Sequence, residues 1–196
     1  MAEISLDDEI DLDMLEYWFD EVLDKYYFDS ELLDLLMIAT GNRETCLVGI
    51  YYSREQIQYL IEFCEFYDLN CHIEDTKNLM QRFKDFLRKL SRQKTYIQKE
   101  AWISRSELPK FPRFYSQEDI GCFLNYPETA IEAFTNDRMA EKVSDYVSFR
   151  PAENDIEPLL AEEQKRINLL KKLNKKGLDF PAHWLEEFET YSNASS

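Results

Sequence analysis

Hydrophobic positions repeat with a helical period at the start of the chain. Across residues 8–27, apolar side chains recur at a spacing close to 3.6 residues with acidic residues between them, at Ile10, Met14, Tyr17, Trp18, Val22 and Tyr26. This pattern predicts an amphipathic helix with an acidic outer face. A second helix is predicted over residues 30–40, with Asp29 or Ser30 as its cap and Gly41 as its end. Residues 1–43 are therefore expected to form an acidic helical pair.

The period changes after this pair. Residues 45–52 and 69–75 are short β-rich runs, and residues 53–67 between them follow a helical pattern. A strand, a helix and a strand over this length form a plausible βαβ unit with parallel strands. We expect residues 44–196 to be an α+β domain: helix-rich, with a small three- to four-stranded sheet that contains this βαβ unit and is covered by amphipathic helices. The domain and the N-terminal pair are expected to form one compact unit.

Composition favours a folded chain outside the membrane. Of the 196 residues 44% are apolar and 14% aromatic, which is enough to bury a core despite a net charge of −16. The beginning of the chain lacks a leader pattern, and no uncharged apolar run approaches a membrane span. The four cysteines have no C-x-x-C spacing, as expected of reduced thiols in the cytoplasm. We expect a soluble, cytoplasmic protein that does not bind membranes.

Charge is segregated along the chain. Residues 1–75 contain 20 acidic and 3 basic side chains, whereas residues 77–113 contain 3 acidic and 11 basic ones. Aromatic side chains interrupt the basic stretch, a composition typical of contacts with phosphates or acidic partners. The candidate partner-binding residues are Arg82, Arg88, Lys89, Arg92, Lys94 and Lys99. The alternative is that this stretch pairs with acidic helices of its own chain or of a second subunit.

The sequence contains no established catalytic motif. Its two histidines, His72 and His183, fall in different predicted elements, and the H-x-E sequence at His72 lacks the P-C-x-x-C partner of a zinc deaminase. No glycine follows the first predicted strand, so a phosphate-binding loop of the usual kind cannot form there. We expect neither a metal site nor a bound cofactor.

The sequence between residues 116 and 134 predicts a corner between two helices. Ser116 can cap a short helix, Asn125 can end it, and Pro127 suits the first turn of the next helix. The stretch LNYPETAIEAF resembles the signature L-G-Y-P-x-C-C-x-x-x-F of the domain-of-unknown-function 483 family, which is uncharacterised and largely archaeal. The matching positions are Leu124, Tyr126, Pro127 and Phe134.

The resemblance implies a shared fold more than a shared activity. This chain has Asn125 in place of the family's glycine, and Thr129 and Ala130 in place of its cysteine pair. A second family segment that contains cysteine corresponds to SFRPAENDIEPLL, again without cysteine, and the loose resemblance extends over residues 45–173. If the family cysteines bind a metal or carry out redox chemistry, this chain lacks the ligands.

Two classes of function follow. The first is a non-catalytic interaction or regulatory protein whose basic segment, residues 77–105, docks on an acidic or phosphorylated partner. The second is an enzyme acting on a nucleotide or RNA, with a pocket formed by Arg113, Tyr126, Glu128 and Arg150. A structural homodimer that uses its own charge asymmetry is a third alternative.

Overall fold

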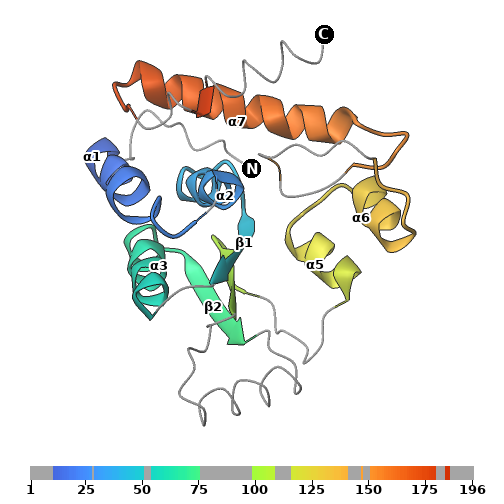
Figure 1. Ribbon diagram of the computed structural model, residues 1–196, viewed down its shortest axis with the longest axis horizontal. Helices are drawn as coiled ribbons and strands as arrows, with labels where there is room; N and C mark the ends of the chain where they lie inside the picture. The colour runs from blue at the N-terminus through green and yellow to red at the C-terminus, as the bar shows by residue number, and fades with distance from the viewer. Residues whose placement is uncertain are drawn as a thin grey trace, which may run out of the picture.

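The computed structural model of the chain is shown in Figure 1. It describes residues 11–27, 29–50, 54–75, 99–108, 116–140, 147, 151–179 and 184–185. The helices are α1 (Leu12–Glu16), the π-helical η1 (Tyr17–Val22), α2 (Asp29–Ala39), α3 (Arg54–Phe66), α5 (Gln117–Phe123), α6 (Glu128–Thr135) and α7 (Glu157–Lys175). The strands are β1 (Thr45–Ile50), β2 (Asn70–Asp75) and β3 (Lys99–Ser104). The protein has a helix-rich α+β fold, as the sequence predicts.

The three strands form one sheet in the order β1-β3-β2. Strand β3 is antiparallel to both neighbours, so β1 and β2 run in the same direction with β3 between them. Helix α3 connects β1 to β2 along the chain. The predicted βαβ unit is therefore present in its split form, in which a third strand separates the two parallel strands.

The two faces of the sheet have different neighbours. The register places Cys46 of β1 and Cys71 of β2 on either side of Ile103, and this row belongs to the main hydrophobic core. The next row, with Trp102 at its centre, faces the opposite side because strand side chains alternate. There the Trp102 ring meets Phe123 of α5 edge to face, with the ring centroids 4.9 Å apart. Both faces of the central strand are thus covered.

One hydrophobic core joins the N-terminal helices to the sheet and to α7. It contains Leu15 and Phe19 from the first helical segment, Leu36 of α2, Phe63 of α3 and Leu170 of α7. In Figure 1 α7 lies across the layer formed by α1 and α2, while α5 and α6 lie on the other side of the sheet from α3. The acidic N-terminal helices therefore pack on the sheet rather than extending away from it.

The buried face of α7 contains a charged residue. The buried positions of this helix are Leu159, Arg166, Leu169, Leu170 and Leu173, which follow a helical period. Pro158 lies in the first turn and Gly177 follows the last with φ of 98°, a conformation that glycine adopts without steric cost. No helix within the described ranges has the length and apolar character needed to cross a membrane.

The corner at residues 116–134 forms as its sequence predicts. Ser116 and Asp119 make a capping box at the start of α5: the Ser116 hydroxyl accepts from the Asp119 amide, and the Asp119 carboxylate accepts from the Ser116 amide at 2.8 Å. Asn125 has φ of 54°, which turns the chain toward α6. Gly121 lies against Ile131, so α5 and α6 pack closely.

Candidate functional site

The basic segment predicted to bind a partner lies mostly outside the described residues. Arg82, Arg88, Lys89, Arg92 and Lys94 fall in the undescribed stretch 76–98, and Lys99 is the first residue of β3. Lys99 is half-buried and is the register partner of Asp75, the last residue of β2. The chain therefore leaves β2 and enters β3 at the same end of the sheet.

The four residues of the predicted pocket are only partly described. Arg113 and Arg150 lie outside the described ranges. Glu128 is exposed in the first turn of α6, and Tyr126 is half-buried before it. The Arg43 guanidinium lies over the Tyr126 ring at 5.6 Å from its centroid, a cation–π contact. Tyr126 is thus packed against a side chain that the sequence analysis does not associate with it.

Arg43 belongs to a buried ionic cluster that also contains Asp34 and Arg166. The Asp34 carboxylate accepts hydrogen bonds from both guanidinium groups, each at 2.5 Å. Asp34 is 2% exposed and Arg166 fully buried, and Glu162 lies 3.6 Å from Arg166 at the edge of the cluster. Burial, the largest single effect, lowers the pKa of Arg43. The nearby Asp34 carboxylate raises it, together with smaller contributions from Tyr126 and Glu162, so the net shift is upward.

The ionic cluster connects three parts of the fold. Asp34 belongs to α2, Arg43 precedes β1, and Arg166 belongs to α7. Arg43 also donates to the carbonyl of Leu124 at 3.5 Å, next to Tyr126 at the corner. The Asp34 side chain is only 3% exposed and is bonded to two guanidinium groups, so the arrangement is that of a cluster that holds these segments together.

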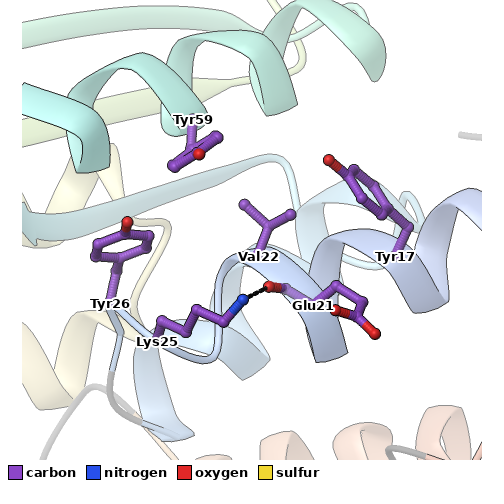
Figure 2. Close-up of a pocket in the computed structure, with 6 residues that line it drawn as sticks. All are labelled: Tyr17, Glu21, Val22, Lys25, Tyr26 and Tyr59. Carbon is purple, nitrogen blue, oxygen red and sulfur yellow. Dashed lines mark hydrogen bonds between the residues drawn. The ribbon is translucent and has the colours of Figure 1, made fainter.

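A groove lined by three tyrosines lies on another part of the surface, between the N-terminal helical segment and α3 (Figure 2). We call it the tyrosine groove; it encloses about 260 Å³ and is lined by Tyr17, Glu21, Val22, Lys25, Tyr26 and Tyr59. Val22 lies between the rings, and Tyr59 faces the other residues from α3. The Tyr26 and Tyr59 rings are 5.8 Å apart and inclined by 34°.

Charges around the tyrosine groove are mostly negative. Lys25 lies along one side, with its ammonium donating to the backbone carbonyl of Glu21, while the Glu21 carboxylate points away from Tyr59 (Figure 2). Burial raises the pKa of the Tyr26 hydroxyl, and the nearby Glu55 carboxylate raises it further. The groove thus combines aromatic faces with one acidic and one basic lining side chain, on elements that carry an excess of acidic residues.

A second hollow, of about 420 Å³, lies beside α6. Its lining is mainly polar and consists of Thr129, Glu132, Ala133, Asn136, Arg138, Ala152, Glu153 and Asn154. Thr129 donates to the Asp155 carboxylate at 2.8 Å and so ties α6 to the segment before α7. Neither Tyr126 nor Glu128 lines this hollow or the tyrosine groove.

The cysteines form no metal centre in the described part of the chain. Cys46, Cys64 and Cys71 lie in or against the core and Cys122 is exposed, all as free thiols. Cys64 of α3 and Cys71 of β2 share a hydrogen bond, which lowers the pKa of Cys71 and raises that of Cys64. No group of three or more potential ligands gathers anywhere in the described ranges.

Comparison with protein-family models, curated proteins and solved structures gave no match to this chain. The resemblance of the Tyr-Pro corner to the domain-of-unknown-function 483 family therefore stays a prediction.

Two features of the site region were missed by the sequence analysis, although both leave a signal in the sequence. Asp34 interrupts the apolar run LLDLLMIA, and Arg166 occupies a position on the apolar face of α7. A single charge on an apolar face indicates a buried partner, because an unpaired buried charge is very costly. The tyrosine groove has a weaker signal, since Tyr17, Tyr26 and Tyr59 also fit core positions by spacing.

Proposed function

We propose that the protein is a non-catalytic interaction or regulatory protein that docks an acidic or phosphorylated partner through its basic segment, residues 77–105. The supporting observation is positional. Asp75 and Lys99 are register partners at one end of the sheet, so the stretch between them is anchored at both ends at the same place. A charged segment inserted in this way is presented by a rigid base and can be opposed by a partner without rearrangement of the core.

Some cations of the basic segment contact the fold itself, and the others are candidates for binding a partner. Arg105, just after β3, donates to the carbonyl of Ile38 at 2.8 Å and so links the end of β3 to α2. Lys99 is half-buried at the start of β3. The proposed partner contacts are therefore the cations that lie between the two strands in the sequence, among which Arg88 and Lys89 are adjacent. A cytoplasmic setting fits this proposal, because the described cysteines are free thiols.

The experiment is a titration with a phosphoserine-rich peptide at low and at moderate salt. Binding that weakens as salt rises, and that is largely lost in the double variant Arg88→Glu with Lys89→Glu, supports the proposal. The matched control reverses two exposed cations of α7, Lys171→Glu with Lys175→Glu, and should bind like the unmodified protein. Unchanged affinity after reversal of Arg88 and Lys89 would overturn the proposal.

The same titration separates the alternatives. Salt-sensitive binding of total cellular RNA, without binding of the phosphopeptide, would favour the nucleotide or RNA enzyme. A salt-sensitive increase in the mass of the protein alone would favour the homodimer. The enzyme alternative gains no support from the described pocket residues, because Tyr126 is stacked against Arg43 while Glu128 lies exposed on α6.

A further inference from the structure

The tyrosine groove has the composition of a site for a cation. Tyr17 is 47% exposed, whereas Tyr26 and Tyr59 are half-buried, so the rings are accessible from one side and supported from the other. The face of a tyrosine ring attracts a positive charge that lies within about 6 Å of its centroid. Three such rings line this one hollow.

The surrounding charge complements a cationic ligand. Residues 11–27 and 54–66, which form the two walls of the groove, carry nine acidic and two basic side chains. One of the two basic side chains is Lys25, whose ammonium is already bound to the Glu21 carbonyl. The negative potential of these walls therefore favours a positive ligand over a neutral or anionic one.

The polar groups of the groove indicate which kind of cation fits. The Glu21 carboxylate is directed away from the rings, and the Glu21 carbonyl already accepts from Lys25. A primary ammonium needs hydrogen-bond acceptors. The two Glu21 groups do not supply them inside the groove, and each tyrosine hydroxyl lies at the edge of its ring rather than over the ring face. A methylated ammonium needs none, because its charge is spread over methyl groups that pack against tyrosine rings and against Val22.

We propose that the tyrosine groove binds a trimethylammonium group. The site is independent of the basic segment and carries the opposite electrostatic preference. Lys25 is expected to weaken the interaction, because its positive charge lies on the wall of the groove. The proposal therefore makes two predictions: loss of a ring face weakens binding, and loss of the Lys25 charge strengthens it.

The test is a titration of the full chain with choline, in which binding is monitored through the NMR chemical shifts of the tyrosine rings. The comparison ligand is the uncharged carbon isostere of choline, in which carbon replaces the quaternary nitrogen. The proposal expects choline to bind at least about fivefold more tightly than the isostere, because the shape is the same and only the cation–π attraction differs. Equal binding of the two ligands, or no binding of choline, would overturn it.

Variants locate the site. Tyr59→Leu should weaken choline binding at least about fivefold and Tyr59→Phe should retain it, because phenylalanine keeps the aromatic face. Tyr17→Leu removes a second aromatic ring from the groove, at an exposed position where the substitution should not impair folding. Lys25→Ala should tighten binding, and Glu107→Gln, which removes an exposed acid just after β3 and outside both walls of the groove, should leave it unchanged. Equal affinity for Tyr17→Leu, Tyr59→Leu and the unmodified protein would place the ligand elsewhere and reject the proposal.

Two sources can supply this group, and a further titration distinguishes them. A peptide that contains trimethyllysine and binds more tightly than choline indicates a methylated protein, whereas choline that binds as tightly as the peptide indicates a small ligand. Either result supports the groove as a trimethylammonium site. An unmethylated peptide that binds as tightly as the trimethylated one contradicts it.

Discussion

Asp34 and Arg166 lie 132 positions apart in the chain, yet their side chains meet at 2.5 Å in the interior of the protein. Asp34 belongs to α2 and Arg166 to α7, and the second guanidinium on the same carboxylate comes from Arg43. Two cations thus share one acid at the centre, and Glu162 lies at the edge. The acid is the common member, so its removal has the largest effect.

Replacement of Asp34 is expected to destabilise the protein more than replacement of Arg166. Asp34→Asn removes the carboxylate that two buried guanidinium groups share, with Glu162 still 3.6 Å from Arg166. Its expected cost is about 3–5 kcal/mol in the free energy of unfolding. Arg166→Met removes one cation while Asp34 keeps Arg43, and methionine packs in the apolar surroundings, so a smaller loss is expected. Urea denaturation measures both variants. A larger loss for Arg166→Met than for Asp34→Asn would contradict the shared-acid arrangement, and Lys165→Met provides an exposed control on α7.

Substitution of Gly121 tests the packing of the corner. A Cβ atom at this position would lie 2.7 Å from Cγ1 of Ile131. Alanine is the better helix former, but overpacking of this kind costs about 1–3 kcal/mol, so Gly121→Ala should destabilise the protein. In an Ile131→Ala background the same substitution should be neutral or stabilising, because the clash is removed. A thermal denaturation series of the four proteins measures the coupling, and additive effects would show that Gly121 is not required for close packing.

Glu100 is expected to make stability fall as pH rises. Burial, and then the charge of the cross-strand neighbour Glu74, raise the pKa of the Glu100 carboxyl above its ordinary value. The native state then binds this proton more tightly than the unfolded chain does, so ionisation destabilises the native state. Glu100→Gln should raise stability at neutral pH by up to about 1 kcal/mol, the scale of cross-strand charge pairs, and the gain should disappear below about pH 4.

The control for this prediction is Glu107→Gln, which removes an exposed acid just after β3. Urea denaturation of both variants between acidic and neutral pH separates a local effect at Glu100 from a general effect of net charge. If both substitutions stabilise the protein equally at neutral pH, the high overall negative charge is the cause and the pairing with Glu74 is not.

Cys71 is expected to react as a thiolate at lower pH than an ordinary cysteine. Hydrogen bonding from the Cys64 thiol lowers the pKa of Cys71, although partial burial opposes this shift. In Cys64→Ala the donor is lost, so the pH midpoint for alkylation of Cys71 by iodoacetamide should rise. Peptide mapping by mass spectrometry follows Cys71 and the exposed Cys122 in the same sample. A midpoint that does not move for Cys71 would contradict the role of the Cys64 donor.

Local elements of this fold are encoded by nearby residues, and the sequence predicts them well. Ser116 and Asp119 are three positions apart, so their capping box is visible in the sequence, and Asn125 and Pro127 mark the turn that follows. The strands at residues 45–50 and 70–75 were predicted to within about two residues, since their composition differs from that of the helix between them. These predictions succeed because the residues that determine each cap, turn or strand lie within a few positions of one another in the sequence.

Strand order and the sites depend on contacts between distant residues. The hydrophobic pattern of the strands does not reveal that β3 lies between β1 and β2. The same pattern of apolar positions would also fit a sheet in which β1 pairs directly with β2. The tyrosine groove requires Tyr59 on α3 to face Tyr17 and Tyr26, and spacing alone assigns all three to a core. The sequence by itself determined the class of the fold, the helices and strands between residues 29 and 75, the corner at residues 116–134 and the charge layout, whereas the single helix predicted over residues 8–27 is divided into α1 and η1. Only the tertiary structure decided that Asp34 would meet Arg166, and that three tyrosines would share a solvent-accessible groove, because these contacts depend on how the elements pack.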